Sequence, residues 1–203
     1  MKELLHEYEL VTSLFEGQTR FDGLSVIGSY PQQDSRRVEL TDLLERPGPV
    51  LEFDRCHFKL VNMEGMPLVG AQFRQCEFET SSLEEIDAHG ARFEGCYIRH
   101  SSLRDATMRG TQMIGSLLRM VNIGGAHVAW SQWLGAEFTY CFGVEDVIGM
   151  PIASVQQCVM DMPTYKRVTQ HLQSYGIDAT HYRVCAVMRE YPAVQLSIFR
   201  GPR

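Results

Sequence analysis

Residues 71–95 read AQFRQ CEFET SSLEE IDAHG ARFEG, and the middle residue of each group of five is apolar. The same spacing continues without a break in both directions, from residue 53 to residue 138. The eighteen middle residues, called the centres below, are Phe53, Phe58, Met63, Leu68, Phe73, Phe78, Leu83, Ala88, Phe93, Ile98, Leu103, Met108, Met113, Leu118, Ile123, Val128, Trp133 and Phe138. Because 44% of the chain is apolar, chance would produce this series with a probability on the order of 10⁻⁷. The period of five is therefore a property of the fold.

The residue two places before each centre is restricted as well. Fifteen of these eighteen residues are Ala, Ser, Cys, Thr or Val. A helix repeats about every 3.6 residues and a flat strand about every two, so a period of five belongs to neither. It predicts a coil that turns a corner every five residues. The centre and the small residue point inward, and the other three positions face solvent.

This pattern resembles the pentapeptide-repeat family, whose motif is Ala-(Asp/Asn)-(Leu/Phe)-X-X. Good local matches are residues 71–75, 91–95 and 136–140, which read AQFRQ, ARFEG and AEFTY. The resemblance implies a mainly β fold, a right-handed quadrilateral β-helix with four pentapeptides in each coil. Residues twenty apart then lie on one face of the solenoid.

The chain divides into three parts: an N-terminal capping segment of residues 1–50, the β-helix of residues 51–143, and a C-terminal segment of residues 144–203. The spacing of apolar residues predicts a short amphipathic helix over residues 3–15. The open ends of a solenoid expose core and unpaired backbone. We therefore expect both flanks, which combine α and β elements, to cover the ends.

The C-terminal segment contains one predicted helix and two predicted strands. The helix spans residues 163–175 and stops at Gly176. Its apolar side carries Tyr165, Val168, Leu172 and Tyr175. The strands span residues 182–188 and 193–199, and we expect them to pair as a hairpin.

The net charge of −6 is spread unevenly, with −4 in residues 1–50, −3 in residues 51–143 and +1 in residues 144–203. No part is basic enough to predict direct nucleic-acid binding through phosphate contacts. No apolar run has the length of a membrane span. The start, Met1–Glu7, carries acids where a signal peptide carries bases. We expect a cytoplasmic protein, or one secreted as an effector without a cleaved signal.

Six cysteines raise the question of disulfides or a metal site. Cys56, Cys76 and Cys96 are twenty residues apart and stack at an inward position, where Cys serves as a small apolar filler. The sequence contains no Cys-X-X-Cys or paired Cys/His spacing, so it predicts no metal, no cofactor and a reducing compartment. It also contains no phosphate loop, nucleophile elbow or paired-carboxylate signature, which argues against an enzyme.

The later coils carry apolar residues at positions that face solvent. Such residues usually lie under a cover or a partner, since monomers rarely expose large apolar patches. Arg99 and Arg119 lie in adjacent coils and break the alternation of charge along their face. The predicted interaction surface combines this pair with Ile114, Leu117, Met120, Trp130 and Leu134. We expect the C-terminal segment to fold back over it, with a self-dimer as the alternative cover.

The family resemblance implies a rigid, non-enzymatic scaffold that binds a protein partner, and secreted bacterial effectors are among the family's members. Other members act on a type II topoisomerase (gyrase) as DNA-mimicking, acidic, dimeric rods. Here the repeat is short and carries a charge of only −3. A third hypothesis places a small enzyme in residues 144–203. We expect a macromolecular binding module first, a gyrase-directed inhibitor or protection protein second, and an enzyme last.

Overall fold

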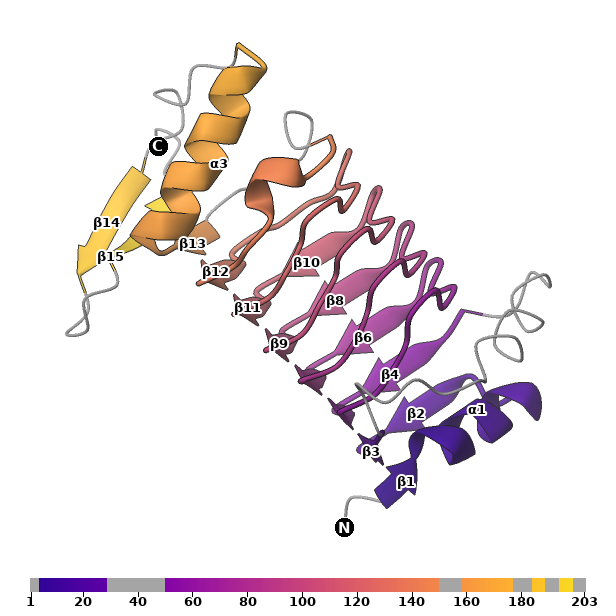
Figure 1. Ribbon diagram of the computed structural model, residues 1–203. Helices are drawn as coiled ribbons and strands as arrows, with labels where there is room; N and C mark the ends of the chain where they lie inside the picture. Colours follow the sequence, from indigo (N-terminus) through magenta and orange to yellow (C-terminus); the bar gives the residue numbers. More distant parts are fainter. Residues whose placement is uncertain (1–3, 29–49, 150–157, 177–183, 189–193, 199–203) are drawn as a thin grey trace.

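The computed structural model describes residues 4–28, 50–149, 158–176, 184–188 and 194–198 (Figure 1). These residues form a rod of stacked coils with helix α1 at one end and helix α3 at the other. The predicted class, a mainly β solenoid with four faces, is confirmed. No helix within these ranges is long and apolar enough to cross a membrane.

Two faces of the solenoid carry sheets. Face 1 has a 5-stranded sheet in the order β10-β8-β6-β4-β2. Its strands are β2 (Arg20–Asp22), β4 (Glu52–Asp54), β6 (Gln72–Arg74), β8 (Arg92–Glu94) and β10 (Gln112–Ile114). Face 2 has a 10-stranded sheet in the order β1-β3-β5-β7-β9-β11-β12-β13-β15-β14. Its strands are β1 (Leu4–His6), β3 (Ser25–Ile27), β5 (His57–Lys59), β7 (Glu77–Glu79), β9 (Tyr97–Arg99), β11 (Leu117–Arg119), β12 (Glu137–Thr139), β13 (Cys158–Met160), β14 (Val184–Met188) and β15 (Val194–Ile198).

The other two faces are held by isolated β-bridges between coils. Face 3 contains the bridged column Asn62, Ser82, Ser102, Asn122 and Phe142. Face 4 contains the bridged column Pro67, Asp87, Thr107, His127 and Ile148. Through residue 142 the bridged partners are twenty residues apart, which confirms the predicted repeat of four pentapeptides per coil.

The core is a continuous column inside the coils. Every centre is buried, with at most 3% of the residue exposed. The residues two places before the centres are buried as well, apart from the half-buried Leu51. Phenylalanines of successive coils stack, with 5.0 Å between the ring centroids of Phe53 and Phe73 and 4.8 Å between those of Phe73 and Phe93. Each such side chain contributes about 1.5–3 kcal/mol by burial, so this column supplies most of the stabilising free energy.

The residue two places after each centre turns the corner. All eighteen such residues have a positive φ; eight are glycines and ten are not. From Arg55 to Met120 their backbone N–H groups donate to carbonyls of the next coil, for example from Gln75 N to Glu94 O at 2.8 Å and from Met120 N to Thr139 O at 2.9 Å. Glycine adopts this left-handed conformation without steric cost, whereas a bulky residue adopts it only with backbone strain. The sequence predicted a corner in every pentapeptide but did not reveal which position turns it, because so many residue types occupy that position.

The stack begins before the predicted start at residue 51. Phe21 in β2 is buried, and its ring stacks on that of Phe53 with 5.0 Å between the centroids. These two residues are 32 apart instead of twenty, so the early coil does not lie on the series counted back from Phe53. The predicted helix over residues 3–15 is divided between strand β1 and helix α1 (Glu7–Phe15).

Helix α3 (Met162–Ser174) confirms the predicted C-terminal helix. It begins at the N-cap Asp161, whose Oδ1 accepts a hydrogen bond from Thr164 N at 3.0 Å. Its buried residues are Thr164, Val168 and Leu172. Tyr175 was predicted on this side and is instead exposed, because it lies beyond the last turn. Strands β14 and β15 pair antiparallel as the predicted hairpin, and β13 joins them to face 2.

Candidate interaction surface

Exposed apolar side chains gather in the C-terminal part of the rod. In the described part of the chain, the large apolar residues exposed from residue 120 onward are Met120, Trp130, Leu134, Tyr140, Phe142, Ile148 and Tyr175. Those exposed before residue 120 are Ile27, Val50 and Val69. Of the predicted surface, Ile114 and Leu117 are half-buried and the other three apolar residues are exposed. The structure distributes this surface over three corners of the solenoid.

Ile114, Leu117 and Leu134 surround the corner between faces 1 and 2, and we call this cluster the Gly115 edge. Gly115 turns the corner, and its N–H donates to Leu134 O at 2.8 Å. Leu117 pairs in register with Tyr97 of the preceding coil. The cluster is therefore an aliphatic ridge that spans two coils and adjoins an aromatic ring.

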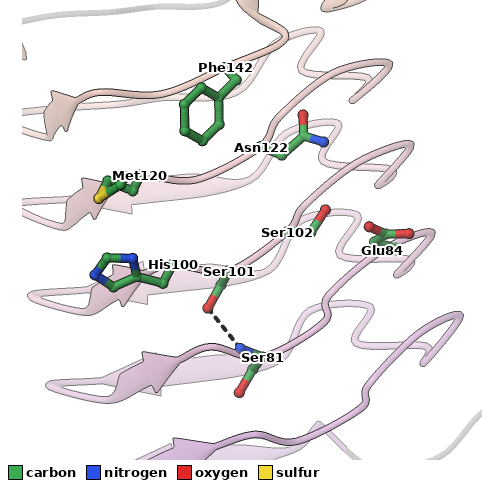
Figure 2. A pocket seen from close by; sticks show the side chains of 8 residues that line it. All are labelled: Ser81, Glu84, His100, Ser101, Ser102, Met120, Asn122 and Phe142. Atoms are coloured by element: carbon green, nitrogen blue, oxygen red, sulfur yellow. Dashed lines mark hydrogen bonds between the residues drawn. The ribbon is translucent and has the colours of Figure 1, made fainter. Parts of the chain in front are cut away.

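A groove of about 380 Å³ follows the corner between faces 2 and 3. It is lined by Ser81, Glu84, His100, Ser101, Ser102, Met120, Asn122 and Phe142, and we call it the Met120 groove. Figure 2 shows Phe142 and Met120 in the coils at one end of the groove, with Glu84 in an earlier coil. Tyr140 occupies the same corner one coil after Met120 and is exposed. Tyr140 and Phe142 were missed in the sequence, although both stand at solvent-facing positions of the last pentapeptides.

Close backbone packing holds Phe142 at the end of this groove. Gly143 has a φ of 71°, and a Cβ at this position would lie 2.5 Å from Gly124 Cα and 2.9 Å from Asn122 Oδ1. Asn122 Oδ1 itself accepts a hydrogen bond from Gly124 N at 3.0 Å. The Phe142 carbonyl also accepts from Ile123 N at 3.0 Å. Phe142 is thus exposed on a backbone that cannot shift freely.

Trp130 turns the corner between faces 4 and 1. The three preceding coils carry Gly70, Gly90 and Gly110 at this corner. Trp130 has a φ of 57° and is 60% exposed, with the Arg109 guanidinium 5.0 Å from its ring centroid. A bulky residue in the left-handed region costs roughly 1–3 kcal/mol. The cation–π contact, about 0.5–1 kcal/mol at an exposed site, offsets part of this cost.

The two arginines of the predicted surface differ in their contacts. Arg99 Nη2 lies 2.8 Å from Glu77 Oε1 and 3.1 Å from Glu79 Oε2, so its charge is neutralised between coils. Arg119 follows Arg99 in register, is exposed, and forms no ion pair within the described residues. Of the two, Arg119 is the one available to a partner.

The coil also brings His57 together with Glu77 and Glu79 on face 2. His57 Nε2 lies 3.9 Å from Glu77 Oε2 and 3.5 Å from Glu79 Oε2. These are residue types that bind divalent metals, and the twenty-residue repeat is the signal that could have shown Glu77 beside His57. However, Arg99 pairs with both carboxylates and Lys59 Nζ lies 3.6 Å from Glu79. The basic partners favour an ion-pair network over a cation site.

The cysteines of the solenoid core pack as small apolar side chains. Cys56, Cys76, Cys96 and Cys141 are buried and free, which confirms that they fill space in the core, and Cys158 is buried as well. Burial raises the pKa of the Cys141 thiol to about 12, and burial does the same for Cys158. Both therefore stay protonated at neutral pH and are poor nucleophiles.

The described part of the C-terminal segment covers the end of the rod, not the predicted surface. Asp161 Oδ2 accepts from Tyr140 N at 3.0 Å, Arg167 Nη1 donates to Cys141 O at 3.0 Å, and His171 Nε2 hydrogen-bonds Val147 O at 2.8 Å. The expectation that this segment wraps over the apolar surface is wrong for these residues, because Met120, Trp130 and Leu134 stay exposed. The open end, with its buried core and unpaired backbone, gains more from the cover.

Residues 81–119 match the family model for pentapeptide repeats, with 8 copies. This match and the four-faced solenoid identify the chain as a pentapeptide-repeat protein. Two solved structures with a similar fold are trypsin-treated variants of QnrB1, a plasmid-mediated fluoroquinolone resistance protein. Their sequences are 15% and 14% identical to this chain; the matches cover 77% of this chain and 80% and 81% of theirs, each with a TM-score of 0.52. At this identity the likeness shows the fold. No curated protein sequence matches the chain.

Proposed function

We propose that this protein is a non-enzymatic scaffold that binds a protein partner through the outer surface of its last coils. The observation that carries the proposal is a change in surface character along the rod. The early coils present charges that are paired with one another. The coils from residue 114 to residue 148 present the Gly115 edge, the apolar end of the Met120 groove and Trp130.

Ion pairs neutralise the surface of the early coils on faces 1 and 2. The pairs are Arg20–Glu52, Arg55–Asp22, Arg74–Glu52, Arg92–Glu94, Lys59–Glu79, Arg99–Glu77 and Arg99–Glu79. Such exposed pairs add little stability, about 0–1 kcal/mol each. Each charged side chain in these pairs is neutralised by its neighbour, so these faces present few unpaired charges to a partner.

The later coils have the composition of a protein interface. Interface cores and binding hot spots are enriched in Trp, Tyr, Met and Arg. Trp130 is exposed at a corner where glycine would avoid backbone strain, so folding stability does not explain it. A role in binding a partner explains the exposed Trp130. Buried free thiols support the cytoplasm, or the interior of a cell that receives the protein as an effector, as the place of action.

The described part of the C-terminal segment supports a binding role over an enzymatic one. Asp161 caps α3 and bonds to Tyr140 N, and His171 bonds to Val147 O. These two groups are occupied in fixing the end cap and are poorly placed to serve as an acid or a base.

The test is affinity capture from extracts of the native host with the full chain. The double variant Trp130→Gly/Leu134→Ser removes two exposed apolar side chains, and Val69→Ser on an early coil is the matched control. The proposal expects a partner that binds the wild type and the control but not the double variant. Equal capture by all three proteins would contradict it. Light scattering after size exclusion would reveal a self-dimer through the same surface.

A gyrase-directed role is the second candidate, favoured by the fold shared with QnrB1, a fluoroquinolone resistance protein. The ion pairs of the early coils argue against a continuous acidic face of the kind that mimics DNA. The discriminating experiment is a DNA supercoiling assay with gyrase, with and without a fluoroquinolone. Inhibition or protection at stoichiometric protein would favour this candidate.

A further inference from the structure

We propose that the Met120 groove binds an extended peptide segment in which an apolar side chain stands beside an acidic one. This inference rests on the proposed protein-binding function and assigns a ligand class to one part of the surface. The groove, at about 380 Å³, lies within the range of about 300–1,000 Å³ that is common for ligand sites. This size suits a few residues of an extended chain.

The apolar contact lies at the Phe142 end of the groove. Met120 and Phe142 both line it and are 39% and 45% exposed. Methionine adapts its shape to different partners, whereas Phe142 is held by the packing of Gly143 on Gly124. A Leu or Phe side chain of the peptide would be buried between one adaptable wall and one fixed wall.

Hydrogen-bond donors line the same part of the groove. Asn122 Oδ1 accepts from Gly124 N at 3.0 Å, which leaves its amide N–H groups to donate. Ser102 Oγ accepts from Arg104 N at 3.4 Å, which leaves its hydroxyl hydrogen to donate. His100 is exposed and can donate as well. This lining suits a ligand rich in acceptors, such as carboxylates and backbone carbonyls.

Charge determines which end of the groove the acidic side chain prefers. Arg119 directly precedes Met120 and forms no ion pair within the described residues. Glu84 lines the groove from an earlier coil. An acidic side chain next to the apolar anchor is therefore attracted to Arg119 and kept away from Glu84, and a basic side chain would be repelled at the Arg119 end.

The peptide cannot add as a further strand on face 3. The backbone there is already paired between coils, with Ser102 N donating to Ser81 O at 3.1 Å and Leu103 N donating to Asn122 O at 2.7 Å. Strand addition needs a free sheet edge. Recognition must therefore depend on side chains, which makes the combination of one apolar and one acidic residue the specific signal.

The test is fluorescence anisotropy of the full chain with a labelled peptide, Gly-Ser-Asp-Leu-Asp-Leu-Asp-Gly. Two comparison peptides replace Asp with Asn, or Leu with Ser. We expect each replacement to weaken binding by about ten-fold, which corresponds to about 1.4 kcal/mol. Arg119→Glu and Phe142→Ser should each weaken it by a similar factor. Leu134→Ser on the Gly115 edge is the control and should leave it unchanged, and circular dichroism checks that every variant is folded.

Equal binding of the Asn peptide, or unchanged binding by Arg119→Glu and Phe142→Ser, would overturn the inference. So would a failure to bind at millimolar peptide, or competition by free glutamate as strong as that by the peptide, which would indicate a small-carboxylate site. If the peptide fails while affinity capture still yields a partner that depends on Trp130 and Leu134, the inference fails and the proposed function stands. If the peptide binds but affinity capture yields no partner, the inferred peptide site in the groove stands and the proposed function fails.

Discussion

Asp161 joins the last coil to helix α3, and its replacement should release the helix from the end of the solenoid. The side chain is completely buried. Its Oδ1 accepts from Thr164 N at 3.0 Å, and its Oδ2 accepts from Tyr140 N at 3.0 Å. One carboxylate therefore caps the helix and holds the last corner of face 2.

The cost of Asp161→Ala follows from the two donors that it leaves unpaired. A buried N–H without an acceptor costs about 1–3 kcal/mol, so the total is about 2–6 kcal/mol. Asp161→Asn keeps an oxygen for Thr164 N but places an amide N–H₂ group against Tyr140 N, so it should cost about half as much. Both costs fall on the contact between α3 and the last coil, because the phenylalanine column lies elsewhere.

Hydrogen exchange with mass spectrometry measures this effect locally. We expect Asp161→Ala to lose protection across Met162–Ser174 while strands β6 and β8 keep theirs. Asp146→Ala is the control, because Asp146 is exposed and its replacement should change stability by less than about 0.5 kcal/mol. Wild-type protection of α3 in Asp161→Ala would refute the reasoning, since it would mean that the carboxylate does not hold the helix.

Three further outcomes follow from the core and the last coil. Phe73→Ala should lower the free energy of unfolding, measured in urea, by about 3–5 kcal/mol. Replacement of the exposed Phe142 by Ala should lower it by less than about 1 kcal/mol. Equal losses for the two variants would contradict the burial of Phe73 and the exposure of Phe142. Cys141 and Cys158, with pKa values of about 12, should react slowly with a thiol reagent between pH 7 and 9 and rapidly in denaturant. Their thiolates form only as the pH approaches the raised pKa, so fast native reaction at pH 8 would contradict their burial. Gly143→Ala should lower the melting temperature, because its Cβ would meet backbone 2.5 Å away; an unchanged temperature would argue against this packing.

The repeat could be predicted from the sequence because every coil uses the same inward positions. Phe53, Phe73 and Phe93 report the period directly, and each is buried as expected. The early coil with Phe21 could not be found in this way, since the period holds only where no residues are inserted between coils. Helix α3 was predicted by its apolar spacing, but the side chain that fixes it, Asp161, has no apolar pattern to reveal it.

The candidate surface was predicted in part. Met120, Trp130 and Leu134 stand at solvent-facing positions, so their outward placement followed from the register. Their exposure did not, because a cover by the C-terminal segment was expected. The spread of this surface over several faces followed from the register as well, because Ile114 and Leu134 are twenty residues apart whereas Leu117 and Trp130 belong to other faces. The cover that the C-terminal segment provides for the end of the solenoid was predicted. The wrap of this segment over the apolar surface was wrong for the described residues, because the open end of the solenoid competes for the same cover. The sequence offers no measure of which surface gains more from being covered.

Site-specific photocrosslinking in the native host tests the central claim most directly. A photoreactive amino acid would replace Trp130 or Leu134 on the last coils, and Val69 on an early coil would serve as the control position. The account predicts a crosslink to one protein partner from the first two positions and none from the third. Equal crosslinking from all three positions, or a crosslink from position 69 only, would contradict the claim that the last coils form the binding surface.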